Sequence, residues 1–153
     1  TIEMWTYCTS NSSENYLLCF GQGATGAANN GFAISYNNGS STGIFFTMYG
    51  IVANQTLTSV APSLNMWHHL AIVRNGPTIA AYVDGVQVGT YSAGTNGMTA
   101  LSSGFNNTIG GYYNTSNTTR LYYTGYIDDM RITKGLARYT ANFIPPSVAL
   151  PRQ

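Results

Sequence analysis

Short runs of alternating or continuous apolar residues recur along the whole chain, and each run is bounded by Gly, Asn or Ser. Nearly all are of strand length, rich in β-branched and aromatic residues and free of internal proline, which is typical of β-strands. Only residues 134–139 look helix-like, for about one turn. We therefore expect an all-β sandwich or barrel, with strands at residues 1–8, 15–21, 31–36, 43–49, 66–74, 78–85, 86–92, 107–113 and 121–133.

The dipeptide Asp84-Gly85 gives the clearest local prediction. It lies between two alternating runs, where Asp-Gly indicates a two-residue hairpin turn, and this turn would pair Val83 with Val86. Residues 75–77 (Asn-Gly-Pro) predict a second turn, in which the proline lies outside the hydrogen-bonded ladder. Residues 66–91 should therefore form a three-stranded antiparallel meander. We interpret Asp84 and Gly85 as structural turn residues rather than as a metal site.

Charge is scarce in this sequence. Charged residues make up 7% of the chain and the net charge is +1, whereas a typical soluble domain has about a quarter of its residues charged. Such a chain cannot build the basic face that binds nucleic acid. The 153 residues, of which 44% are hydrophobic, suffice for one domain with a core. No apolar stretch is long enough for a membrane span.

Two cysteines, Cys8 and Cys19, lie in the first two runs. If residues 1–9 and 16–21 pair as a hairpin, the two thiols face each other. A cross-strand disulfide and two free buried thiols both remain open. Two isolated cysteines supply only half of a zinc shell, so they do not indicate a metal site.

The order of four blocks carries a family resemblance: WHHLAIVRNG, YVDGVQVGTY, TIGGYY and GYIDDMRITKGLARYTANFIPP. This order resembles the laminin-G-like branch of the concanavalin-A-like lectin and glucanase superfamily. The last block is the most specific, with its Gly-x-Ile-Asp-Asp-x-Arg-Ile strand and its Ala-Arg-Tyr-Thr and Phe-x-Pro-Pro tail. The resemblance, over residues 1–146, implies a two-sheet antiparallel jelly-roll sandwich. It also implies that residues 1–153 are a single domain, a fragment of a longer chain that lacks the family's first strand.

The sequence lacks the acids of the glucanases that share this fold. In those enzymes acidic residues alternate along one strand, so that they share a face. Here Glu3 is followed at the alternate positions by Trp5 and Tyr7. His68 and His69 are adjacent, so they point to opposite faces of a strand, and no nucleophile motif accompanies them. We predict that the chain is not an enzyme.

Asp128 and Asp129 form an adjacent acidic pair. Neighbouring strand residues point to opposite faces, so the two carboxylates cannot line one cleft without a bulge. We interpret them as structural and expect no cofactor and no metal. Calcium bound by this pair is retained as an alternative, although a calcium site needs more oxygen ligands than these acids supply.

The tail that follows is interpreted as a clamp. Phe143 would pack under the end of the sandwich, and Tyr139 belongs to the same motif. The guanidinium groups of Arg131 and Arg138 would bind loop carbonyls or the two aspartates.

Tyrosine is unusually frequent, with 12 residues, two pairs of which are Tyr112-Tyr113 and Tyr122-Tyr123. In a strand, each pair puts one ring inside and one outside. An exposed tyrosine suits both sugar stacking and protein interfaces. The ligand contacts that we predict from this are Tyr112, Tyr113, Asn114, Asn117, Tyr122 and Tyr123.

The domains that this chain resembles occur in tailed-phage virions and on bacterial surfaces. We therefore expect a non-catalytic structural or adhesion module of a tail fibre, tail appendage or capsid, at the virion surface or otherwise extracellular. It would recognise host-surface glycan, contact other virion or surface proteins and form a homo-oligomer. The alternatives are a decoration protein without a sugar site, a calcium-dependent adhesion domain and, with least support, a glycoside hydrolase.

Overall fold

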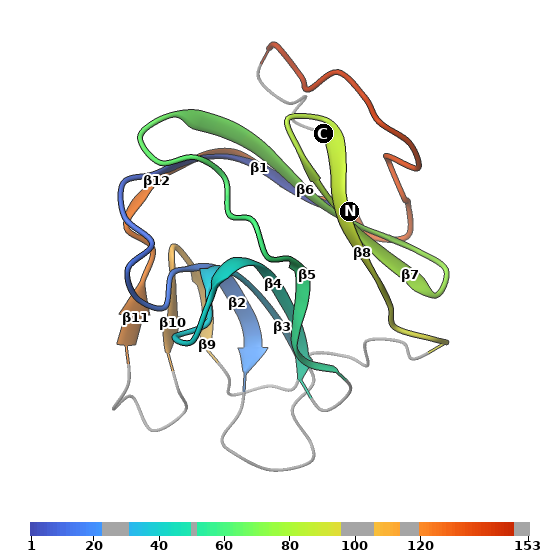
Figure 1. Cartoon of the computed structure of the whole chain (residues 1–153). Helices are drawn as coiled ribbons and strands as arrows, with labels where there is room; N and C mark the ends of the chain where they lie inside the picture. The colour runs from blue at the N-terminus through green and yellow to red at the C-terminus, as the bar shows by residue number, and fades with distance from the viewer. Residues whose placement is uncertain (23–30, 50–51, 96–105, 114–119, 149–153) are drawn as a thin grey trace.

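The computed structural model describes residues 1–22, 31–49, 52–95, 106–113 and 120–148 (Figure 1). Strands are the regular elements of these ranges, which contain no helix, so residues 134–139 do not form the helical turn expected of them. The strands are β1 (Ile2–Cys8), β2 (Tyr16–Gln22), β3 (Gly31–Asn37), β4 (Thr42–Tyr49), β5 (Val52–Thr58), β6 (Trp67–Asn75), β7 (Thr78–Val83), β8 (Val86–Ser92), β9 (Asn106–Ile109), β10 (Gly111–Tyr113), β11 (Arg120–Tyr122) and β12 (Gly125–Ile132).

The strands form two stacked antiparallel sheets, seen as an upper and a lower layer in Figure 1. Sheet A has the order β12-β1-β6-β7-β8, and sheet B has the order β5-β4-β3-β2-β9. The short pair β10-β11 packs beside β2. This arrangement confirms the all-β, jelly-roll sandwich expected from the sequence.

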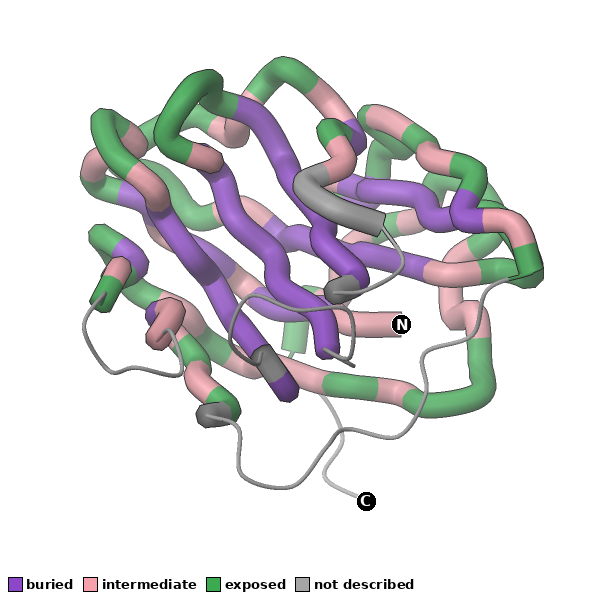
Figure 2. The backbone as a smooth tube through the Cα atoms, turned by 90° about the horizontal axis from the view of Figure 1, so that it is seen from below, coloured by how far each residue is buried: buried purple, intermediate pink, exposed green. Residues whose placement is uncertain are grey.

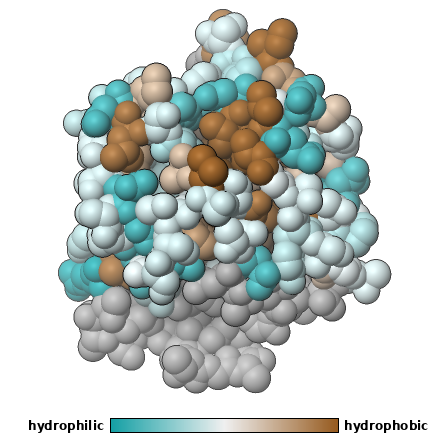
Figure 3. All heavy atoms as spheres, viewed as in Figure 1, coloured by the Kyte–Doolittle hydropathy of each residue, from teal (hydrophilic) through white to brown (hydrophobic). Residues whose placement is uncertain are grey.

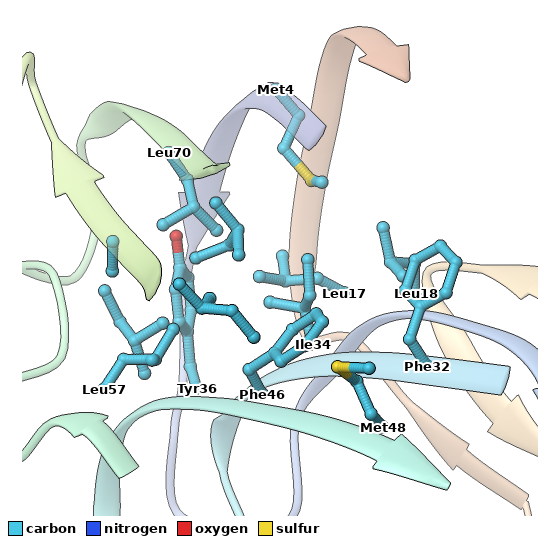
Figure 4. Close-up of a cluster of buried hydrophobic side chains, with 14 of the residues drawn as sticks. Met4, Leu17, Leu18, Phe32, Ile34, Tyr36, Phe46, Met48, Leu57 and Leu70 are labelled. Atoms are coloured by element: carbon cyan, nitrogen blue, oxygen red, sulfur yellow. The ribbon is translucent and has the colours of Figure 1, made fainter. Parts of the chain in front are cut away.

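The core lies between the two sheets, and period-two alternation explains which side chains enter it. In β1, Met4 and Cys8 point into the core and are buried. Met4 and Leu70 from sheet A face Ile34 and Phe46 from sheet B (Figure 4). Figure 2 shows the central strands as buried tubes and the turns as exposed ones. This apolar burial is the main stabilising contribution to such a sandwich.

The predicted meander is confirmed. Strands β6, β7 and β8 are sequential antiparallel neighbours, and Val83 pairs with Val86. The turn residues Asp84 and Gly85 have φ angles of 50° and 78°, as a two-residue turn with both φ angles positive requires. Within the predicted turn at residues 75–77, Gly76 and Pro77 connect β6 to β7.

Several local features differ from what the sequence suggested, and the run at residues 121–133 forms two strands, β11 and β12, instead of one. Strands β1 and β2 do not form a hairpin, because β1 belongs to sheet A and β2 to sheet B. Cys8 therefore enters the central core, while Cys19 packs on the other face of sheet B, and the two buried thiols are not joined to each other. Strand β5 was not foreseen. Gly110, with a φ of 74°, separates β9 from β10 within a run expected to be one strand.

Candidate functional site

The outward face of sheet A has two different halves. Because side chains alternate along a strand, the outward residues of β1 are Glu3, Trp5 and Tyr7. The half around Glu3 is covered by the tail that follows β12. The half around Tyr7 carries exposed aromatic side chains. Figure 3 shows the mixed surface of one side of the molecule, where apolar residues gather over the upper half, at the level of sheet A.

Two aromatic rings hold the tail on sheet A. Tyr139 and Phe143 stack with their ring centroids 3.6 Å apart and their planes inclined by only 7°. The Phe143 ring also contacts Tyr82, at 5.5 Å, and His69, at 5.7 Å. The Phe143 amide donates a 2.9 Å hydrogen bond to the carbonyl of Gly85, in the β7–β8 turn. The tail therefore lies across the face of sheet A, not under the end of the sandwich as the sequence suggested.

Beneath the tail, the carboxylate of Glu3 is fully buried. Its Oε1 accepts hydrogen bonds from the Nε (2.8 Å) and Nη2 (2.7 Å) of Arg131, and its Oε2 accepts one of 2.6 Å from the Tyr139 hydroxyl. The Nε2 of His69 lies 3.5 Å from Oε2. Burial alone would raise the pKa of Glu3, but His69, Tyr139 and Arg131 outweigh it and lower this pKa to about 2.

This network corrects the expected partners of the arginines. Arg131 binds the carboxylate of Glu3, which the sequence did not indicate as its partner. The Nε of Arg138 donates to Thr133 Oγ1 at 2.7 Å and lies 3.9 Å from Glu3 Oε1. Oε1 of Glu3 thus binds the last strand through Arg131, and Oε2 binds the tail through Tyr139, as in a structural ion pair.

The exposed half carries three rings that we call the aromatic row: Tyr126 of β12, Tyr7 of β1 and Trp67 of β6. These residues are directly paired across neighbouring antiparallel strands, so their side chains share one face. The ring centroids of Tyr7 and Tyr126 are 5.8 Å apart, and those of Tyr7 and Trp67 are 5.6 Å apart. The outer two residues are 64% (Tyr126) and 46% (Trp67) exposed. The row is therefore a solvent-facing aromatic strip built on three rigid strands.

Two further side chains border the aromatic row. Trp5 is half-buried and makes an edge-on contact with His69, with ring centroids 5.4 Å apart. Asp128 pairs with Trp5 and shares its face, exposed to solvent. The register of β12 shifts beside Asp128, and Asp129 has a φ of 48°. A bulge at this point therefore interrupts the regular alternation of side chains along β12. The Asp129 amide donates a 2.8 Å hydrogen bond to Asp128 Oδ1.

The predicted tyrosine contact region is only partly brought together. Tyr113 and Tyr122 meet edge-on, with centroids 6.3 Å apart, and Tyr122 is exposed. Tyr112 packs on the buried Tyr16. Tyr123 is buried in the main core. Of the remaining residues that the sequence proposed, Asn114 and Asn117 lie outside the described residues.

Asp84 holds the β7–β8 turn against the two histidines of β6. The Asp84 carboxylate contacts His68 Nδ1 at 2.6 Å and accepts a 2.9 Å hydrogen bond from the His69 amide. His68 lies on the core side of β6 and His69 under the tail, which confirms that they point to opposite faces.

Among the described residues, no group of three or more His, Cys, Asp or Glu side chains could hold a metal ion.

A cleft lies at one end of the sandwich, away from the aromatic row. This cleft, of about 770 Å³, opens between the start of β1, the β6–β7 turn and the start of the tail. Its floor consists of core side chains such as Phe46 and Ile79, and Arg74 and Lys134 border it. The Arg74 guanidinium donates to the carbonyls of Gly76 and Gly94. The cleft thus has an apolar floor and a cationic border, unlike the neutral aromatic row.

Sequence reasoning did not find the aromatic row. Its three residues come from three separate runs, and nothing in one run indicates the other two. One signal was present within the first run, where Trp5 and Tyr7 follow Glu3 at period two and so share its face. To find the row, one also needs to know that β1 pairs with β6 and β12, which brings together residues far apart in the chain.

The fold is that of a lectin-like β-sandwich. A laminin-G family model, described as the concanavalin A-like lectin/glucanases superfamily, matches residues 1–137. The chain therefore belongs to this superfamily. No curated protein matches the sequence significantly. In the described residues, no helix is long and apolar enough to cross a membrane.

Among solved structures, the chain is similar to a heptameric SAP-like pentraxin from Limulus polyphemus. The TM-score is 0.60 at 13% sequence identity, and the match covers 85% of this chain. The chain spans 61% of the pentraxin. At this identity the likeness concerns the fold alone.

Proposed function

We propose that this domain is a non-catalytic module that binds carbohydrate through the aromatic row. The observation that carries the proposal is that Tyr126, Tyr7 and Trp67 lie side by side and open to solvent on the part of sheet A that the tail leaves uncovered. Aromatic rings bind the apolar faces of sugars, and tyrosine and tryptophan add a polar group at the edge. Asp128, exposed beside the row, can accept hydrogen bonds from sugar hydroxyls.

The network around Glu3 supports binding without catalysis. Glycoside cleavage needs a carboxylate free to act as nucleophile or base and a second one that serves as acid. Here the oxygens of Glu3 are held by Arg131 and Tyr139 beneath the tail. Such a carboxylate is buried and cannot be reached by a sugar lying on the surface.

The test is retention in affinity electrophoresis by soluble polysaccharides: hydroxyethyl cellulose, barley β-glucan, xylan, galactomannan, glycogen and polygalacturonate. We expect at least one neutral polymer to retard the protein, and Trp67→Ala to abolish the retardation. Val60→Ala, which changes a residue that is 71% exposed elsewhere, is the matched control and should behave as wild type. Free migration in every gel, or retention unchanged by Trp67→Ala, would refute the proposal.

Tyr122→Ala in the same gels tests the rival tyrosine surface on the β10–β11 pair. If it alone abolishes retention, the binding surface lies there and the aromatic row is not the site. The association of this module with a virion or a bacterial surface, and its assembly into a homo-oligomer, stay predictions from the sequence.

A further inference from the structure

The aromatic row runs across the strands of sheet A, and this direction limits the shape of its ligand. Tyr7 lies between two neighbours and is inclined by 63° to Trp67 and by 61° to Tyr126. The outer two rings are the more exposed ones, and Tyr7 is half-buried between them. A ligand on this surface therefore makes its main contacts at two places, with a weaker contact between them.

The spacing of these two places follows from the sheet. Trp67 and Tyr126 belong to strands that are two positions apart in sheet A, and neighbouring strands are separated by about 4.8 Å, so the two positions are roughly 10 Å apart. In an extended β-1,4-linked glycan, alternate sugar rings present the same face at a similar repeat. Chains with α-1,4 linkages are helical, so their sugar rings do not repeat at this spacing along a straight line.

The tail restricts the ligand in the direction along the strands. Moving along β1 from Tyr7 towards Glu3, the surface reaches Trp5 and then the Tyr139–Phe143 stack over His69. A linear ligand lying along the strands would collide with the tail. A ligand lying across the strands would follow the aromatic row and would not meet the tail.

The charge beside the row is negative. Asp128 shares the outward face with Trp5 and Tyr126, whereas the cation Arg131 is engaged with the buried Glu3. An exposed carboxylate accepts hydrogen bonds from hydroxyl groups but repels uronic acids and sulfated sugars. The surface thus favours neutral polymers over anionic ones.

From these observations we infer that the aromatic row binds an extended, neutral, β-1,4-linked polysaccharide laid across strands β12, β1 and β6. Alternate sugar rings stack on Trp67 and Tyr126, and the ring between them passes over Tyr7. This inference rests on the proposed carbohydrate-binding function and adds the class of polymer, its direction and the smallest unit that is recognised, a trisaccharide.

The experiment measures Kd by calorimetry for oligosaccharides of increasing length. The β-1,4-linked series are cello-, xylo-, manno- and chito-oligosaccharides from two to six units, and maltohexaose and hexagalacturonate represent α-linked and anionic chains. We expect one β-1,4-linked series to bind roughly tenfold more tightly as a trimer or tetramer than as a dimer, because the second aromatic stack is then reached. Maltohexaose and hexagalacturonate should bind at least as weakly as the dimer.

Trp67→Ala and Tyr126→Ala should each remove the dependence on length, so that hexamer and dimer bind alike. Ile132→Ala, at an exposed position near the far end of β12, is the control and should keep it. Equal affinity for dimers and hexamers in the wild type, or preferred binding of maltohexaose, would overturn the inference while leaving carbohydrate binding intact. Absence of binding to every oligosaccharide and every polymer would instead refute the proposed function itself.

Discussion

The hydroxyl of Tyr139 donates a 2.6 Å hydrogen bond to the buried carboxylate of Glu3, so the tail is fastened to the first strand across 136 positions of sequence. The same carboxylate binds Arg131 on β12. One acidic side chain thereby connects the first strand, the last strand and the tail. It lies in the half of sheet A that the tail covers, and Trp5 stands between it and the aromatic row along β1.

Removing the Tyr139 hydroxyl should weaken this attachment. In Tyr139→Phe the stack on Phe143 is kept and one hydrogen bond to a charged group is lost. We expect the free energy of unfolding to fall by about 2 kcal/mol, measured by urea denaturation. Tyr122→Phe, at an exposed position, removes a hydroxyl from the surface and should change stability by less than about 0.5 kcal/mol. Equal effects of the two substitutions would show that the Glu3 contact contributes nothing.

The same network predicts a dependence of stability on pH. The pKa of Glu3 is lowered from its ordinary value of 4.5 to about 2 in the folded protein. Between these values the unfolded chain binds more protons than the folded one, so the stabilisation is complete above 4.5 and is lost as the pH falls towards 2. The difference in unfolding free energy between wild type and Glu3→Gln should therefore be largest near neutral pH and shrink in acid. A difference that stays constant from pH 7 to about pH 3 would contradict this assignment.

The two arginines near Glu3 should not be equivalent. Arg131 places its Nη2 2.7 Å from Glu3 Oε1, whereas the Nε of Arg138 is 3.9 Å from that oxygen and donates to Thr133. Arg131→Ala leaves a buried carboxylate without its counter-ion and should cost about 3 kcal/mol. Arg138→Ala should lower the melting temperature less, with a loss of about 1 kcal/mol. Thermal and urea unfolding of both variants would measure the two losses of stability. A larger loss for Arg138→Ala would show that Arg138 is the main partner of Glu3.

The sequence was informative where structure is set locally. The Asp84-Gly85 turn and the pairing of Val83 with Val86 follow from two adjacent runs and the backbone conformation that glycine permits. The alternation of Tyr122 and Tyr123, one exposed and one buried, follows from the period of a strand. The assignment of β1 and β2 to different sheets could not be read in this way, because a connection of this length suits a hairpin as well as a crossing between sheets.

The candidate site depended on information that is not local. Glu3 meets Arg131 because a bulge at Asp129 shifts the register of β12 by one position. Without that shift, a different residue of β12 would face Glu3. The aromatic row likewise depends on the order β12-β1-β6 in sheet A. The periodicity of each run predicts which of its residues share a face, but not which other strand lies beside that face.

Gly85 offers a sharper test of how the tail is attached. A Cβ added at Gly85 would lie 1.8 Å from the carbonyl oxygen of Phe143, whereas one added at Gly76 in the β6–β7 turn would meet no atom within 4 Å. Both glycines have positive φ angles, 78° and 56°, so alanine introduces similar backbone strain of about 1 kcal/mol at each position. The additional effect at Gly85 therefore reports the contact with the tail. We expect Gly85→Ala to destabilise the protein more than Gly76→Ala. It should also expose the sites after Arg131 and Arg138 to trypsin, as followed by mass spectrometry. If the two variants unfold alike and are cleaved alike, the tail does not depend on its close approach to the β7–β8 turn.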